Sequence, residues 1–128
     1  MARLLDVVFD CRHPASLARF WAAALDGHAV APYDEAELAR LRASVIDEPE
    51  DDPTVLVEPS PGSGPRLWFQ RVPEARQVKN RVHLDLASAD VSAEVGRLTG
   101  LGARVLAEPG RWVTMADPEG NEFDVTPG

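Results

Sequence analysis

The chain has 128 residues, the size of a single ordinary domain, and a formal net charge of −8 at pH 7. That charge disfavours binding to nucleic acid and to anionic membranes, both of which require a basic surface. A single cysteine excludes an intrachain disulfide and no apolar run is long enough for a membrane span, so we expect a cytoplasmic protein without nucleic-acid or membrane partners.

The first half of the chain alternates between strand and helix signals. Residues 4–10 are rich in β-branched and apolar types, which predicts a strand. Pro14 suits the first turn of a helix, and the sequence from Asp34 resembles a capping box that opens a second, shorter helix. Two further strands, at 54–58 and 66–72, are expected on either side of a turn rich in proline and glycine.

The second half shows the same order of signals. Asp90 is placed to cap a helix that closes before a pair of glycines. Asp117 to Gly120 has the proline and glycine of a type I turn, so the strands on either side form a hairpin. The strands expected in this half are 81–86, 104–107, 112–116 and 121–126.

An internal repeat relates the two halves. Residues 5–9 match 82–86, and 67–70 match 121–124, which indicates two copies of one supersecondary unit. A strand, a helix and further strands, twice over, predict an α+β fold with helices on one face of the sheet.

Strand alternation divides the side chains into two faces. The apolar face, where helices should pack, carries Leu5, Val7, Phe9, Leu67, Phe69, Val82, Leu84, Leu86, Phe123 and Val125. The other face carries Asp6, Val8, Asp10, Trp68, Gln70, His83, Asp85, Glu122 and Asp124. Such a face can simply be hydrated, but an aromatic side chain such as Trp68 suits a pocket better than open water. We therefore expect a ligand cleft there.

Four segments resemble one known superfamily: 20–27, 70–74, 79–86 and 117–123. They are similar to the glyoxalase / bleomycin-resistance / dioxygenase (vicinal oxygen chelate) superfamily, and in particular to a glyoxalase-like subgroup. The resemblance implies a single domain over 1–128, built from two tandem βαβββ modules (about 1–74 and 79–128). The modules would pair into a curved sheet around a cleft, with helices on the outer face, and the protein would form a homodimer.

The same resemblance implies a metal site. Members of the superfamily place one ligand on the first and last strand of each module, and the matching positions here are Asp6, Gln70, His83 and Asp124. These donors suit Zn²⁺, Ni²⁺, Mn²⁺ or Mg²⁺, and a site without metal is the alternative. The expected walls of the ligand cleft are Trp68, Asp85, Trp112 and Glu122.

Three functions stay open at this point. The first is a metal-dependent lyase or isomerase acting on a small molecule with adjacent oxygens. A dioxygenase is disfavoured, because the ligand positions lack the second histidine of a two-histidine iron site. The second is a metal-free protein of the bleomycin-resistance type, which sequesters a drug or metabolite, and the third is an accessory domain without a ligand.

Other residues receive structural interpretations. His28 follows a helix stop and is expected to be exposed, and Cys11 is interpreted as a packing residue. The acidic, proline-broken segment 47–53 is interpreted as a solvated linker, with a lid over the cleft as the alternative.

Overall fold

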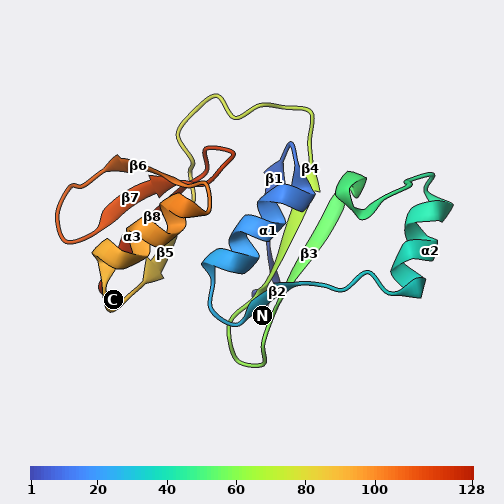
Figure 1. Ribbon diagram of the computed structural model, residues 1–128, viewed down its shortest axis with the longest axis horizontal. Helices are drawn as coiled ribbons and strands as arrows, with labels where there is room; N and C mark the ends of the chain where they lie inside the picture. Colours follow the sequence, from blue (N-terminus) through green and yellow to red (C-terminus); the bar gives the residue numbers. More distant parts are fainter. The chain divides into compact units, whose positions relative to one another are not determined.

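The computed structural model describes all 128 residues. The chain divides into two compact units, Met1–Ala75 and Arg76–Gly128, and each contains one four-stranded mixed sheet (Figure 1). The predicted α+β fold of two βαβββ modules is therefore confirmed. None of the helices has the length and hydropathy that a membrane span requires. That the two units act as one domain stays a prediction.

The first unit has seven elements of secondary structure. They are β1 (Asp6–Cys11), α1 (Pro14–Ala24), β2 (His28–Val30), α2 (Glu35–Ala43), the 3₁₀ turn η1 (Pro49–Asp51), β3 (Thr54–Pro59) and β4 (Arg66–Arg71). The strand order is β1-β4-β3-β2. The first and last strands, β1 and β4, run parallel, and the other neighbours are antiparallel.

The second unit repeats this plan without a counterpart of α2. Its elements are β5 (Leu84–Ala87), α3 (Val91–Gly100), β6 (Arg104–Ala107), β7 (Val113–Ala116) and β8 (Glu122–Thr126). The strand order, β5-β8-β7-β6, is that of the first unit, again with the first and last strands parallel. The internal repeat predicted from the sequence is thus a repeat of topology.

The helix starts follow the local signals in the sequence. Pro14 occupies the first turn of α1, where its missing N–H is not needed. The carboxylate of Asp34 accepts a 2.9 Å hydrogen bond from the backbone N–H of Glu37, and Asp90 accepts one of the same length from Ala93. Both predicted caps are confirmed, since each satisfies a backbone donor that the first helical turn leaves free.

An aromatic cluster forms the core of the first unit. Phe69 is fully buried and stacks on Phe9 with ring centroids 5.0 Å apart. Trp21 of α1 lies 5.3 Å from Phe9 and meets Phe20 edge to face. These contacts attach α1 to the apolar face of the sheet, which the helix covers in Figure 1.

The core of the second unit contains one aromatic side chain. The only buried residue of α3 is Leu98. The fully buried Met115, Phe123 and Val125 of β7 and β8 complete this core. The apolar face predicted for the last strand is thus confirmed.

Two strands begin later than predicted. The side chains of Leu5 and Val82, both assigned to the apolar face, are 56% and 78% exposed. Each precedes the first residue that has a partner on the neighbouring strand, since β1 pairs from Asp6 and β5 from Leu84. Without a partner strand, their alternation does not bury them.

The structure contains one strand that the sequence does not predict. His28–Val30 forms β2, which pairs only with β3 at the edge of the sheet. Three residues are too few to show a period of two. His28 is also half-buried rather than exposed, and its Nδ1 lies 2.9 Å from the carbonyl oxygen of Asp26.

The predicted turn between β7 and β8 is closed by a buried aspartate. Asp117 is 1% exposed, and its Oδ1 accepts hydrogen bonds from the backbone N–H groups of Glu119 and Asn121, both at 2.9 Å. Its Oδ2 accepts a third bond from the Asn121 side chain, also at 2.9 Å. Gly120 takes a φ of +88°, which favours glycine.

Removing this carboxylate tests its structural role. We expect Asp117→Ala to lower the free energy of unfolding by about 1–3 kcal/mol, because buried backbone N–H groups lose their acceptor. Urea denaturation followed by circular dichroism measures the change. The exposed Asp47 provides the control, since Asp47→Ala should shift stability by no more than about 0.5 kcal/mol. Equal losses in the two variants would contradict the assignment.

Candidate functional site

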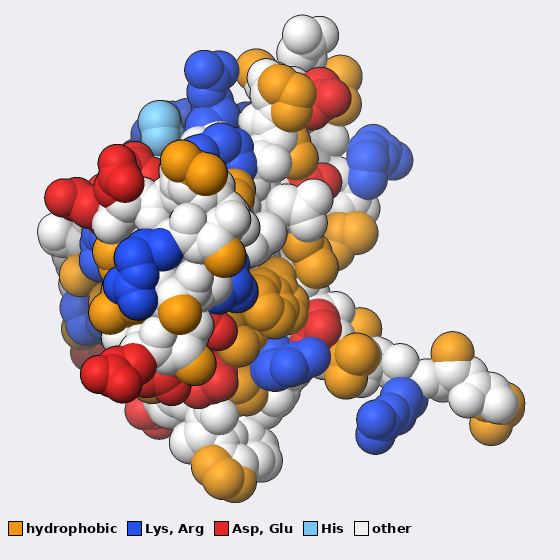
Figure 2. Space-filling model, turned by 90° about the vertical axis from the view of Figure 1, so that its right-hand side faces the viewer, with side chains coloured by type: hydrophobic (Ala, Val, Ile, Leu, Met, Phe, Trp, Pro, Cys, Tyr) orange, Lys and Arg blue, Asp and Glu red, His pale blue; other side chains and the backbone are white.

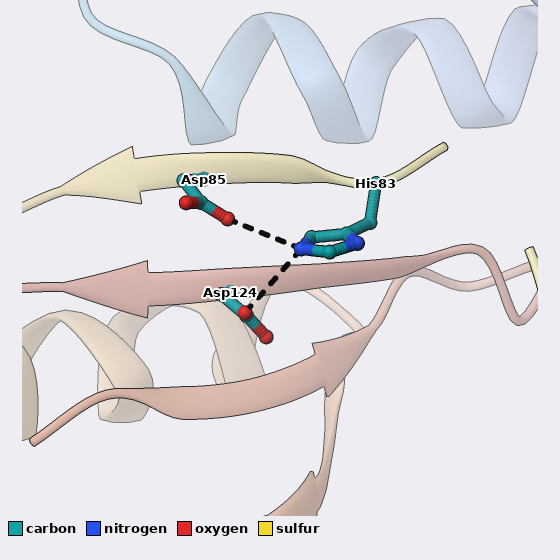
Figure 3. Close-up of side chains that lie close together, drawn as sticks. All are labelled: His83, Asp85 and Asp124. Atoms are coloured by element: carbon teal, nitrogen blue, oxygen red, sulfur yellow. Dashed lines mark ion pairs between the residues drawn. The ribbon is translucent and has the colours of Figure 1, made fainter. Parts of the chain in front are cut away.

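Three potential metal ligands, His83, Asp85 and Asp124, converge in the second unit (Figure 3). One ligand atom from each lies within 4.8 Å of the others. The Nε2 atom of His83 is 3.4 Å from Oδ1 of Asp85 and 3.6 Å from Oδ2 of Asp124. These distances are longer than good hydrogen bonds. They are close to the ~3.4 Å that separates two ligands of a tetrahedral ion with bond lengths near 2.1 Å.

The strand pairing creates this convergence. Asp85 on β5 and Asp124 on β8 are direct partners in the parallel register, so both carboxylates lie on one face. His83 lies two residues before Asp85, and two residues are one full period of a strand. The imidazole therefore reaches the same face although His83 lies just outside the strand.

A threonine holds one of the carboxylates in place. Thr114 is the partner of Asp124 on β7, and its hydroxyl donates a 2.7 Å hydrogen bond to Oδ1 of Asp124. The other oxygen, Oδ2, faces His83. The Asp124 side chain is 18% exposed, whereas that of Asp85 is 64% exposed. One carboxylate is therefore fixed and the other is free to move.

The two ligands predicted in the first unit are not neighbours. Asp6 is the partner of Arg66, four positions before Gln70, which places Asp6 and Gln70 about 13 Å apart along the strands. The Arg66 guanidinium donates to both oxygens of Asp6, at 2.8 and 3.0 Å. This pairing raises the pKa of Arg66 and commits the Asp6 carboxylate to an ion pair. Their roles as metal ligands stay predictions.

The register shows which positions of the two sheets correspond. Each sheet has a row of three polar residues. One lies on the first strand of the module, its direct partner lies on the last strand, and the third lies opposite that partner on the strand before the last. The rows are Asp10, Gln70 and Thr54 in the first unit and Asp85, Asp124 and Thr114 in the second. The sequence repeat matches Asp6 with His83. The strand register instead makes Asp10 correspond to Asp85, which differs from the sequence match by two residues. A shift of two keeps every side chain on its face, so alternation alone could not reveal it.

The four predicted cleft residues have different surroundings. Glu122 pairs with the ammonium group of Lys79. Asp85 belongs to the carboxylate–imidazole cluster. Trp112 is 40% exposed just before β7 and lies close to Gly110. Trp68 lines a pocket within the first unit. A cleft that includes all four stays a prediction.

The pocket beside Trp68 has a volume of about 480 Å³. Its floor is the polar face of the first sheet, with Thr54, Leu56 and Trp68. Its other walls come from residues 31–34 and from the first turns of α2, which follows them in the chain. The hollow therefore lies on the sheet face opposite α1, where the sequence predicted a ligand site.

A buried aspartate, Asp52, anchors the wall of this pocket. Its Oδ2 accepts hydrogen bonds from the Tyr33 hydroxyl at 2.8 Å and from Arg40 at 2.9 Å. Its Oδ1 accepts a third bond from the backbone N–H of Thr54, at 3.0 Å. Asp52 is only 1% exposed, so the interpretation of 47–53 as a solvated linker is wrong at this residue. Three donors, two of them distant in sequence, compensate the burial of the charge.

The environment of Tyr33 keeps its hydroxyl protonated. Burial raises the pKa of Tyr33, and the hydrogen bond to Asp52 raises it further. The phenol therefore remains a donor to the carboxylate throughout the neutral range. Tyr33, Arg40 and Asp52 thus form one connected network at the wall of the pocket.

Comparisons with known proteins identify the same architecture. The family model of the glyoxalase-like domain matches residues 6–126. The fosfomycin resistance protein FosX from Mesorhizobium loti superimposes with a TM-score of 0.68 at 15% identity, over 100% of this chain and 93% of that one. A glyoxalase/bleomycin resistance protein/dioxygenase family enzyme from Burkholderia phytofirmans PsJN gives 0.65 at 15% identity, over 97% of each chain.

A third similar structure contains a metal ion. It is a FosX variant from Listeria monocytogenes in complex with Mn(II) and 1S,2S-dihydroxypropylphosphonic acid. Its TM-score is 0.66 at 11% identity, over 100% of this chain and 91% of that one. At identities this low, the structural superpositions establish a common fold and carry no assignment of activity. No protein of curated function matches the sequence.

The titration of Tyr33 tests the network around Asp52. Tyr33 is the only tyrosine, so the ultraviolet absorbance of phenolate reports it alone. We expect the native protein to form phenolate at a higher pH than the urea-unfolded chain, which should titrate near pH ~10. Because the folded pKa is the raised one, the stabilisation is complete below pH ~10 and is lost as pH rises through the folded value.

Two variants separate this network from general effects of charge. Asp52→Asn should move the phenolate transition toward that of the unfolded chain, whereas Asp51→Asn, at an exposed neighbour, should leave it in place. Coincident transitions in the native and unfolded protein would contradict the predicted network.

Proposed function

Because the chain belongs to the glyoxalase-like domain family, we propose that it is a small-molecule enzyme with a divalent cation bound by His83, Asp85 and Asp124. The observation that carries the proposal is the convergence of these three side chains within 4.8 Å. The chemistry expected from this group is that of a lyase or isomerase acting on adjacent oxygens.

The donor set fits such a cation. One imidazole nitrogen and two carboxylate oxygens suit Mn²⁺, Mg²⁺, Zn²⁺ or Ni²⁺. When bound, the ion would act as a Lewis acid on a carbonyl or hydroxyl oxygen of the substrate. The cluster contains a single histidine, so the donor set differs from the two-histidine site of iron dioxygenases.

The three side chains would have different tasks. Asp124 is oriented by Thr114, an arrangement typical of the residues that support metal ligands. His83 presents Nε2 to both carboxylates, so metal binding requires the ring proton on Nδ1. Asp85 is the most exposed of the three, so its carboxylate would complete the donor set from the solvent side.

A second candidate function is metal-free sequestration of a small molecule. The pocket beside Trp68 supports it, because a cavity of about 480 Å³ has the size of a typical small-molecule site. A cytoplasmic location and a homodimeric state remain predictions for both candidates.

Metal binding distinguishes the two functions. Protein freed of metal with a chelator should bind Mn²⁺ with a stoichiometry near one per chain in isothermal titration calorimetry. Asp124→Asn should weaken binding at least about tenfold, because the amide carries no charge to balance the cation. Asp47→Asn, at an exposed loop position, should bind like the original protein. Absence of binding of all four ions, Mn²⁺, Mg²⁺, Zn²⁺ and Ni²⁺, would refute the metal-dependent function.

Replacing Thr114 tests whether the orientation of Asp124 matters. We expect Thr114→Val to reduce Mn²⁺ affinity about tenfold, since partners of metal ligands commonly contribute that much. The matched control is Thr126→Val on β8, whose hydroxyl contacts only the terminal Gly128 in the hydrogen-bond network. Equal affinities of the two variants would show that the threonine does not support the site.

A further inference from the structure

We propose that the pocket between α2 and the first sheet is a separate binding site for a small organic cation with an apolar body. It lies within the first unit and is lined in part by residues of α2, which is labelled in Figure 1. Every residue of the metal-ligand cluster lies in the second unit. The inference therefore does not depend on a bound metal, and it supplies the ligand class for the second candidate function.

The pocket has an apolar interior. Leu56 and Trp68 contribute from adjacent strands, where they are direct partners, and Ala31 and Pro32 contribute from the connection to α2. Both Leu56 and Trp68 are half-buried, so they retain surface that a ligand can cover. Figure 2, viewed from the side on which α2 is drawn in Figure 1, shows hydrophobic side chains interspersed with charged ones. Such walls bind the apolar part of a ligand.

The charges around the pocket favour a cation. Four carboxylates line it, against a single guanidinium, that of Arg40: Asp34, Glu37, Asp52 and Glu58. Arg40 is bound to Glu37 at 2.7 Å and to Asp52 at 2.9 Å, so its charge is already matched. The lining keeps an acidic excess, which repels anionic ligands and attracts cationic ones.

Glu58 is the carboxylate most available to a ligand. It is exposed on β3, and its side chain makes no hydrogen bond or ion pair. Arg66 interacts with Glu58 through space, but it donates its hydrogen bonds to Asp6. An unpaired carboxylate beside an apolar hollow matches a ligand with one cationic group and one apolar group.

Trp68 adds an aromatic surface next to this charge. The guanidinium carbon of Arg66 lies 5.9 Å from the centre of its ring, so the indole already has one cationic neighbour. Tryptophan is the aromatic residue that attracts cations most strongly. A bare metal ion fits poorly, because the buried Asp52 carboxylate already accepts three hydrogen bonds.

The helix above the pocket is held by few contacts. Leu41 is its only buried residue, and Arg40 is its link to the network around Asp52. A helix with so little buried surface opens at a lower free energy than the sheet beneath it. A ligand that bridges the sheet and α2 should therefore slow hydrogen exchange in residues 35–43.

The test uses metal-free protein and benzyltrimethylammonium chloride as the probe. Benzyl alcohol and sodium benzoate serve as its neutral and anionic comparators. In two-dimensional NMR, we expect the cation to shift the indole N–H signal of Trp68 and leave those of Trp21 and Trp112 unchanged. Benzoate should shift none of them. Equal binding of benzyl alcohol or benzoate, or no shift of the Trp68 signal up to the solubility limit, would overturn the proposal.

Variants locate the site. Glu58→Gln should weaken binding of the cation about fivefold, the effect of one partly exposed charge. Glu74→Gln removes an exposed carboxylate outside the pocket and should leave the affinity unchanged. Leu56→Trp, which fills the hollow, should abolish the Trp68 shift while thermal unfolding shows a folded protein. Unchanged affinity of Glu58→Gln would refute the assigned cation contact.

Repeating the titration with His83→Ala separates this inference from the metal-dependent function. The cation should bind this variant as it binds the original protein, because His83 lies outside the pocket. Loss of cation binding in His83→Ala would contradict an independent site. Failure of Mn²⁺ binding, by contrast, would refute the metal centre and leave the cation result unaffected.

Discussion

The parallel pairing of the first and last strands of each module is the constraint on which the rest of the structure depends. It joins segments as far apart in sequence as Asp6 and Arg66, and it can close only if the chain between them crosses over one face of the sheet. That face receives α1 or α3 and becomes the apolar core. The opposite face is left for polar residues, and the register of the pair decides which of them meet. Asp85 and Asp124 are neighbours for this reason alone.

Local signals allowed much of the fold to be predicted from the sequence. The caps at Asp34 and Asp90 and the turn at Asp117 depend on side chains that bond to backbone groups a few residues away. Alternation likewise separated the two faces of the strands, because it needs no knowledge of the partner strand. Register is different, since it is set by contacts between distant segments. The positions of Asp6 and Gln70 on one face were therefore predictable, and their separation along that face was not.

Asp52 shows the same limit for a single residue. In sequence it is one of several acidic residues beside prolines, and such a segment is usually hydrated. Its burial depends on a phenol and a guanidinium that only the fold brings to it, together with the backbone N–H of Thr54, two residues along the chain. A carboxylate with three donors is stable where an isolated one would not be. The polar network at the wall of the pocket therefore follows from tertiary structure rather than from composition.

The two modules differ most in the connection between their second and third strands in chain order. In the first unit residues 31–53 contain α2 and η1, whereas in the second unit residues 108–112 suffice for the corresponding link between β6 and β7. The longer connection adds a wall to one sheet and takes little part in its core, since Leu41 and Asp52 are its only buried side chains. Duplicated modules can diverge in this way without a change of scaffold. Substitutions, insertions or grafted loops in 31–53 would alter the lining of the pocket and leave the strands that carry the carboxylate–imidazole cluster unchanged. This connection is therefore the natural starting point for engineering a ligand preference.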